Sequence, residues 1–294
     1  MKRKTLFWTS VAAVIGAAIF FTPKVINFLV LSEIQYDRPH EPLFETRPLT
    51  SAESAEVTKA LSQDYTYFGK GGQAYVFFSH DGKYAIKFFK QRHFRYPKYL
   101  DYLPLFKSYK THIFEKRQQV MRKEYGSYKI GFEELPHETA ILYVHLNKTD
   151  HLHKSIDFKD RFGFVHPIDL DKTDFILQRR ATLVFDKISE QMAQKDVEGA
   201  KKTITNIIGL IKTCAKKGFH DNDPKISTNC GMIGDQAVKI DVGRFTYDDR
   251  MKKPLFLKPE LYHHTRSFKF WLSKHYPELI PHLDEEVLQV IIHE

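Results

Sequence analysis

Residues 218–245 read GFHDNDPKISTNCGMIGDQAVKIDVGRF and carry the most informative pattern of this 294-residue chain. Asp221, Asp223 and Asn229 lie on one proline-bearing loop, and Asp241 follows a short predicted hairpin. Phosphoryl transfer needs a carboxylate that orients the nucleophile, and an amide with a second carboxylate that holds magnesium. The segment supplies these residue types in that order. Turn formation and helix capping are the alternative explanation of an Asp-rich loop.

A glycine loop and a lysine-bearing strand lie upstream. Residues 65–90 read YTYFGKGGQAYVFFSHDGKYAIKFFK, which predicts three short strands with a glycine cluster after the first. Gly69, Gly71 and Gly72 have no side chains, so the loop can offer its N–H groups to an anion. Lys87 lies between apolar neighbours, and we expect it to have an anionic partner. An edge-strand lysine that only prevents aggregation is the alternative.

A helix is predicted next, over residues 112–135, because apolar residues recur there at spacings of three and four. Glu124 falls on the apolar side of this helix, where an unpaired carboxylate would be costly. We therefore expect a buried cation as its partner. Glu115 points outward on the same helix. A surface salt bridge of Glu124 to Lys123 or Arg117 is the alternative.

Together these segments resemble the protein kinase-like fold. GKGGQAYV, which starts at Gly69, is similar to the Gly-rich loop of the family, with Ala74 in place of the third glycine. YAIK is similar to the motif that carries the family's strand lysine. Residues 220–229 resemble the catalytic loop, and Asp241 with the Val-Gly that follows resembles the Asp-Phe-Gly triplet.

The resemblance implies a role for each residue of these motifs. Asp223, or alternatively Asp221, would be the catalytic carboxylate. Asp223 is preferred because it precedes Asp241 by 18 residues, although its distance to Asn229 is one residue longer than the pattern asks. Glu124 would hold Lys87, with Glu115 as the fallback. The implied ATP site comprises Gly69, Gly71, Gly72, Ala74, Lys87 and Glu124, and the implied Mg²⁺ ligands are Asn229 and Asp241.

The end of the chain predicts a reduced second lobe. Only 53 residues follow Asp241, and no Ala-Pro-Glu motif is found there. Two helices are expected in this tail. We therefore expect an α+β, two-lobed kinase-like fold, with a small antiparallel-sheet N-lobe (residues 62–181) and a reduced helical C-lobe (residues 182–294).

The beginning of the chain predicts a membrane anchor. Residues 5–23 are uncharged and largely apolar, long enough to span a bilayer, and follow three basic residues. We assign residues 1–33 to an uncleaved transmembrane signal anchor, with a cleaved signal peptide and a buried helix as alternatives. Residues 34–61, which contain three prolines, are expected to be a juxtamembrane linker.

The side of the membrane remains open at this stage. The basic start favours a cytoplasmic N-terminus, with the body on the far side. ATP is scarce outside a bacterial cytoplasm, so an exported effector that acts in another cell's cytosol would reconcile the anchor with ATP chemistry.

The charge and the composition limit the classes of partner that the chain can have. The chain has a net charge of +9, and residues 83–129 hold 13 Lys or Arg against three acids. Anionic lipid is the simpler partner for such a face next to an anchor, nucleic acid is less expected, and a solvated helix surface is the alternative. Two cysteines exclude a disulfide scaffold and a Cys-rich metal site, and 42% hydrophobic residues exclude wholesale disorder.

Three functions follow from these features. The first is an atypical membrane-anchored phosphotransferase that uses ATP and Mg²⁺ to phosphorylate a hydroxyl acceptor. The second is a pseudokinase, in which the altered loop spacing reflects lost chemistry and the fold serves as an interaction scaffold. The third is a basic membrane-surface or nucleic-acid-binding protein whose motifs are coincidental.

Overall fold

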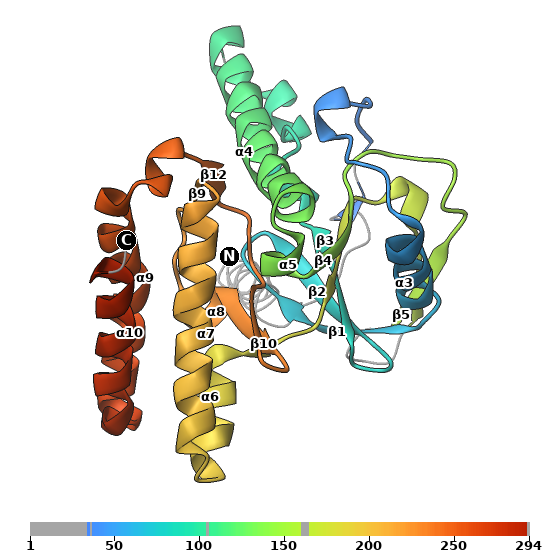
Figure 1. Ribbon diagram of the computed structural model, residues 1–294. Coiled ribbons are helices and arrows are strands. Elements are labelled where there is room, and N and C mark those ends of the chain that lie inside the picture. Colours follow the sequence, from blue (N-terminus) through green and yellow to red (C-terminus); the bar gives the residue numbers. More distant parts are fainter. Residues whose placement is uncertain (1–33, 36, 104–105, 160–164, 293–294) are drawn as a thin grey trace, which may run out of the picture.

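The computed structural model describes residues 34–35, 37–103, 106–159 and 165–292. An N-terminal antiparallel sheet is followed by a helical C-terminal part (Figure 1). The anchor expected at residues 1–33 lies outside the described residues. Among those that are described, no helix is both long and apolar enough to cross a membrane.

In the described part of the chain, the N-terminal sheet has seven strands, so it is larger than the small sheet expected from the sequence. Neighbouring strands are antiparallel, except that β5 runs parallel to β1. Strands β5 and β6 were not predicted, although residues 155–159, SIDFK, alternate strictly between polar and apolar residues. In spatial order the strands are β4 (Ile141–His145), β7 (Phe175–Arg179), β3 (Tyr84–Phe89), β2 (Ala74–Ser79), β1 (Tyr65–Lys70), β5 (Ser155–Lys159) and β6 (Val165–Asp169).

The three strands predicted between residues 65 and 90 are confirmed as β1, β2 and β3. Gly82 has a φ of +69° in the turn between β2 and β3, a conformation that favours glycine. Ile86 and Phe88 belong to the hydrophobic cluster on the side of helix α3 (Ser51–Leu61), whereas Phe89 belongs to the cluster on the side of helix α4 (Lys107–Glu133). Because side chains alternate along a strand, Lys87 lies on the face of Phe89, toward α4 and the helical part.

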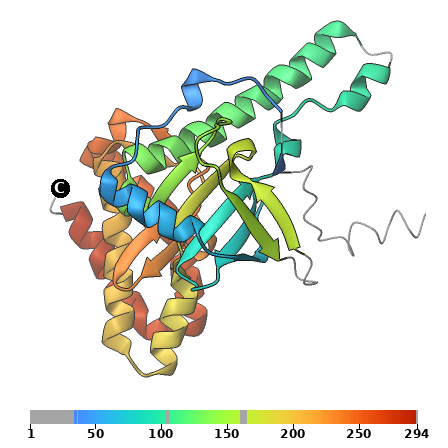
Figure 2. The same ribbon diagram turned by 90° about the vertical axis from the view of Figure 1, so that its right-hand side faces the viewer.

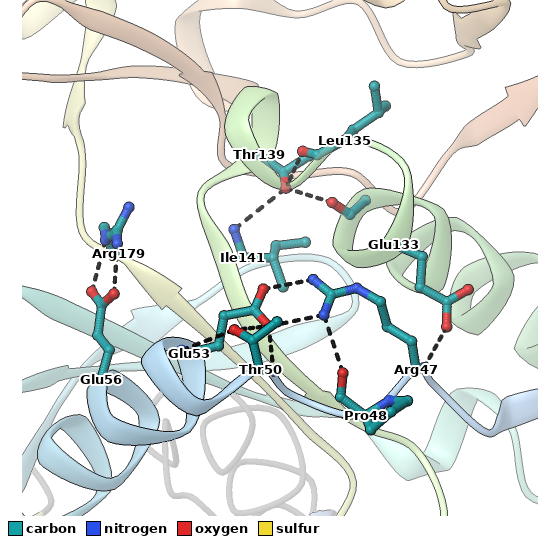
Figure 3. A network of polar contacts seen from close by, with 11 residues as sticks. Arg47, Pro48, Thr50, Glu53, Glu56, Glu133, Leu135, Thr139, Ile141 and Arg179 are labelled. Carbon is teal, nitrogen blue, oxygen red and sulfur yellow. Dashed lines mark hydrogen bonds and ion pairs between the residues drawn. The ribbon is translucent and has the colours of Figure 1, made fainter.

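The segment expected to be a linker, residues 34–61, is part of the N-terminal lobe. Val57, Ala60 and Leu61 of α3 are buried at the helical spacing of three and four, and the prolines of this segment all precede the helix. The bonds in Figure 3 attach the segment to the sheet and to α4. Among them, Arg179 of β7 donates to both carboxylate oxygens of Glu56, at 2.8 and 2.6 Å.

The N-terminus of α3 is held by a second set of bonds (Figure 3). Thr50 and Glu53 form a reciprocal capping box. Arg47 donates to both oxygens of Glu53, at 2.9 and 2.7 Å, and its backbone N–H donates to Glu133 of α4 at 2.8 Å. The arginine holds the pKa of Glu53 down to about 2, against the opposing effect of burial.

Helix α4 begins five residues before the predicted start at 112 and is only half covered. Its C-terminal half packs on the sheet, with Met121, Tyr125 and Phe132 buried. Phe114 and Val120, which were expected to face inward, are 46% and 37% exposed. The first half of α4 extends away from the sheet and from the helical part (Figure 2), so these two side chains are not covered by the main body.

The C-terminal part contains the two helices expected in the tail, α9 and α10, and the helix α7, which precedes the loop of residues 220–229. A helix before α7 and two very short ones were not predicted. Residues 230–239 form the predicted hairpin, with Gly234 at a φ of +59°. The helices are α5 (Pro136–Thr139), α6 (Val184–Ala193), α7 (Val197–Lys216), α8 (Ile226–Asn229), α9 (Pro254–His275) and α10 (Ile280–Ile292). The strands are β8 (Thr182–Leu183), β9 (Phe219–Asp221), β10 (Cys230–Ile233), β11 (Gln236–Lys239) and β12 (Phe245–Tyr247).

Candidate active site

The two candidate catalytic aspartates have opposite environments. Asp221, at the end of β9, is buried, and its Oδ2 lies 2.6 Å from the Nζ of Lys239. Burial alone would raise the pKa of Asp221, but the Lys239 ammonium and the N–H of Asp223 reverse this and lower it. A carboxylate neutralised in the core cannot reach an acceptor, so the alternative assignment of catalysis to Asp221 is not supported by its position.

Asp223 is accessible and lies where a loop carboxylate is needed. Its side chain is 26% exposed, and its oxygens lie 3.7 Å from the Nζ of Lys225 and 4.0 Å from Nη1 of Arg244. The side-chain amide of Asn229 donates to the backbone oxygen of Asp223 at 2.8 Å. This bond closes the loop despite its extra residue, because it ties the two candidate positions directly together.

Asn229 is also joined to the Asp-Val-Gly segment. The N–H of Ile240 donates to the backbone oxygen of Asn229 at 2.8 Å, and the N–H of Asp241 approaches the same oxygen at 3.5 Å. The Oδ1 of Asn229 accepts from the hydroxyl of Thr228 at 2.8 Å. The backbones of Asn229 and Asp241 are therefore adjacent.

Lys87 reaches this segment from β3. Its ammonium donates to the backbone oxygen of Ile240, next to Asp241. Burial lowers the pKa of Lys87, and the nearby Asp241 carboxylate acts in the opposite direction. Asp241, the carboxylate that acts on Lys87 in this way, is itself exposed to solvent.

Glu124 does not form the ion pair with Lys87 that the sequence analysis expected. Within the described chain, neither it nor the exposed fallback Glu115 pairs with Lys87. Glu124 lies against Gly243, where a Cβ atom would come within 2.4 Å of its Oε1. Burial raises the pKa of Glu124 to about 8, Asp241 adds to this effect, and Arg244 opposes it.

Two further residues of α4 hold the Asp-Val-Gly segment and were missed as functional residues. Ser127 donates its hydroxyl to the backbone oxygen of Val242 and accepts from the N–H of Phe245 at 2.6 Å. Tyr128 donates its hydroxyl to Oδ1 of Asp241 at 3.4 Å. The inward spacing of Tyr128 was visible in the sequence, but its partner lies more than 100 residues away and could not be inferred.

The glycine loop lies between β1 and β2 and is held by Lys90, which the sequence analysis did not single out. The Lys90 ammonium donates to the backbone oxygens of Gly71 and Gly72, the second at 3.2 Å. Within the described residues, the N–H groups of Gly72 and Gln73 make no hydrogen bond. The loop therefore turns its carbonyl groups toward Lys90 and leaves two amide groups available for an anion.

The loop glycines are not needed for packing. A Cβ atom built on Gly69 or Gly72 would meet nothing within 4 Å, and neither residue has a positive φ. Ala74, in place of the third glycine, is buried and pairs with Phe89 in the β2–β3 ladder. Gly69 and Gly72 thus have open space around the Cα atom and no strained backbone conformation. Such positions fit a loop that a ligand approaches closely.

A buried polar network joins helix α9 to the start of the loop of residues 220–229. The carboxylate of Glu260 on α9 lies 2.9 Å from Nδ1 of His220 and 3.1 Å from Nε2 of His264. Burial would raise the pKa of Glu260, but His264 and His220 lower it. Glu260 also accepts from the backbone N–H of Asp221. The position of β9 relative to α9 is thus set by these bonds.

The donor set fits magnesium held together with phosphate rather than a protein-only metal site. In the described part of the chain, no group of three or more His, Cys, Asp or Glu side chains could hold a metal ion. Mg²⁺ is commonly bound by one or two carboxylates plus substrate phosphates. Asp241 is exposed, and its Oδ1 makes only two long contacts, at 3.3 Å to the N–H of Gly243 and 3.4 Å to Tyr128.

Known proteins resemble this chain only distantly. No protein-family model matches the chain, and no curated protein is significantly similar to it. Among solved structures, the bifunctional kinase-methyltransferase WbdD matches with a TM-score of 0.36 and 13% identity, over 73% of this chain and 42% of that one. WbdD with the kinase inhibitor LY294002 matches with a TM-score of 0.37 and 12% identity, over 75% and 45% of the two chains.

This chain therefore spans less than half of the WbdD chains that it matches. The resemblance to protein kinases rests on the chain itself: an antiparallel sheet bearing the lysine, a helix packed on the Asp-Val-Gly segment, and a helical part that presents the Asp and Asn loop.

Proposed function

We propose that the protein is an atypical kinase-like phosphotransferase that uses ATP and Mg²⁺ to phosphorylate a hydroxyl acceptor. One observation carries the proposal: Lys87 of the sheet contacts Ile240, the residue before Asp241, while the backbone of Asp241 adjoins Asn229, whose side chain binds the backbone oxygen of the accessible Asp223. Residues separated by more than 130 positions thus meet at the junction of the sheet and the helical part.

Each residue has a role in this proposal that its environment supports. The free N–H groups of Gly72 and Gln73 would bind phosphate, and Lys87 would neutralise phosphate charge. Asn229 and Asp241 would hold the magnesium ion, which supplies charge neutralisation when bound. Asp223 would accept a hydrogen bond from the acceptor hydroxyl and orient it. Positioning and electrostatics of this kind account for most catalysis of phosphoryl transfer.

A pseudokinase is the second candidate, because one specific observation favours it. Lys87 is bonded to a backbone oxygen, and Glu124, with its pKa raised to about 8, is not paired with it. A kinase requires the strand lysine to be held by the helix glutamate. In a pseudokinase the present arrangement would be permanent, and nucleotide binding would be weak or independent of magnesium.

Thermal unfolding of the full-length protein in detergent, with and without ATP and Mg²⁺, tests the proposal. A ligand at about 100 times its dissociation constant stabilises the folded state by about 2.7 kcal/mol. We expect a magnesium-dependent rise of the Tm that is lost in Lys87→Met and Asp241→Asn. Gly72→Ala should unfold at the wild-type temperature without ligand but show a smaller rise.

The remaining outcomes separate the candidates. A rise without magnesium dependence favours the pseudokinase. No rise under any condition contradicts nucleotide binding altogether. If ATP is turned over, Asp223→Asn should abolish phosphoryl transfer, and unchanged transfer would exclude the role given to Asp223.

We also propose that residues 1–33 anchor this enzyme in a membrane, with the side of the membrane open and an exported effector as one arrangement. The apolar run at residues 5–23 supports the proposal. Resistance of the full-length protein to alkaline extraction from membranes is the expected result, and release into the supernatant would contradict it.

A further inference from the structure

The first half of α4 and the residues before it form a projecting arm, defined as residues 98–103 and 106–123. The arm extends away from the sheet and the helical part in both views (Figures 1 and 2). Its large apolar side chains lie in solvent, with Tyr102 89% and Phe106 85% exposed. The others in this group are Leu103, Tyr109, Phe114 and Val120.

The exposed residues continue the core-facing side of α4. Phe106 and Tyr109 are three residues apart, and Val120 follows Tyr109 by 11 residues, about three helical turns. The same side continues at spacings of four to Glu124 and Tyr128, which are buried against the body. One side of the helix is therefore core in its second half and uncovered in its first half. Solvated surface helices carry polar residues at such positions, so an apolar partner is implied.

Charge identifies the kind of partner. Residues 98–123 contain seven Lys or Arg and two acids, a net charge of +5. The side chains of Lys107, Lys116 and Lys123 are exposed beside the aromatic residues. Aromatic rings interleaved with lysines suit the boundary between lipid headgroups and acyl chains, where the rings insert and the cations meet phosphate. A second copy of the arm would carry the same positive charge and be repelled.

The start of the described chain lies beside the arm. Gln35 and Asp37 line the same cavity as Arg92, Arg95 and the arm residue Arg117. Arg117 also donates to the backbone oxygen of Arg92 at 2.5 Å, which fixes the arm to this region. The expected anchor ends at residue 33, so a chain that leaves the bilayer there enters the body next to the arm.

We propose that the projecting arm is a second membrane contact, in which Tyr102, Leu103, Phe106 and Tyr109 insert into the interface of an anionic bilayer. The lysines of the arm bind the headgroup phosphates. This contact is independent of nucleotide chemistry. It orients the body at the membrane surface, whereas a single anchoring helix would leave it free to rotate.

Fluorescent labelling of the full-length protein in vesicles tests the proposal. Phe106→Cys is labelled with NBD, and Phe270→Cys on α9, 62% exposed, is the matched control at an aromatic site outside the arm. The native cysteines, Cys214 and Cys230, are buried. The vesicles contain phosphatidylcholine with about one-third phosphatidylserine and, as quencher, a lipid with a nitroxide on its acyl chain.

We expect at least two-fold stronger quenching at position 106 than at 270, reduced to the control level by Lys107→Glu with Lys110→Glu and Lys116→Glu. Equal quenching at the two positions would overturn the proposal, as would failure of the full-length protein to bind the vesicles. A blue shift at 106 without quenching would also overturn it and indicate a protein occupant. Quenching that survives the charge reversal would exclude the anionic headgroup contact.

Discussion

Lys239 and Asp221 form an ion pair in the core, with Nζ 2.6 Å from Oδ2 and both side chains at most 5% exposed. Removing one partner of a buried pair leaves an uncompensated charge and costs about 3–5 kcal/mol. We expect Asp221→Asn to lower the free energy of unfolding by this amount, measured by urea denaturation, and Asp223→Asn to change it by less than about 0.5 kcal/mol.

The double variant Asp221→Asn with Lys239→Met is the control for this pair. Because it removes both charges, it should recover much of the lost stability. Equal stability losses in Asp221→Asn and Asp223→Asn would contradict the assignment of one aspartate to structure and the other to chemistry.

Lys90 is expected to be a positioning residue for the glycine loop. Lys90→Met removes the bonds to the carbonyl groups of Gly71 and Gly72, so the amide groups of the loop lose their fixed orientation. We expect about ten-fold weaker binding of ATP with Mg²⁺ by calorimetry, equivalent to about 1.4 kcal/mol. Lys83→Met, which changes an exposed lysine in the turn between β2 and β3, away from the glycine loop, should bind like the wild type. Equal affinity of the two variants would show that Lys90 does not act on the loop.

Glu124 should make stability depend on pH. Its pKa in the folded protein is about 8, above the ordinary value of 4.5. Between these values the folded state keeps a proton that the unfolded state has released, so stability falls as pH rises through this window. Glu124→Gln removes the ionisation and should raise the free energy of unfolding at pH 8 by about 1–3 kcal/mol, with little change at pH 5.

The control for this pH dependence is Glu115→Gln, which alters an exposed glutamate on the same helix. Its urea midpoint should match the wild type at both pH values. A stabilisation of Glu124→Gln that is equal at pH 5 and pH 8 would mean that its ionisation is not responsible.

Arg38 should stabilise the N-terminal lobe, although it lies in the segment first interpreted as a linker. Its side chain is 6% exposed and lies 3.5 Å from Asp174, which also accepts from Tyr125 at 2.7 Å and from Gln91 at 3.0 Å. Arg38→Met leaves the buried Asp174 without its cation, and we expect a loss of about 3–5 kcal/mol in urea denaturation.

Arg122 provides the comparison for Arg38. It is 58% exposed, and its guanidinium lies 3.8 Å from Glu41. Arg122→Met should cost less than about 1 kcal/mol, as exposed pairs do. Similar losses for the two arginines would imply that residues 34–61 do not dock on the lobe as described.

The sequence by itself determined the elements whose patterns are local. Alternation in YAIKFF put Lys87 and Phe89 on one face of their strand, and the segments of the tail predicted the helices α9 and α10. Glycines at positions 82 and 234 marked both hairpin turns, since positive φ angles favour them.

Only the tertiary structure decided which charges meet. Glu124 was correctly predicted to be buried, but the apolar spacing of a helix does not say which residue lies opposite, and that residue is Gly243 rather than Lys87. Asp221 and Asp223 look alike in the sequence and are separated by two positions. Lys239 and Glu260, which lie on other elements, contact Asp221 in the core, whereas Asp223 stays accessible to solvent. Long-range contacts, and not the local sequence pattern, determine the dielectric environment of a carboxylate.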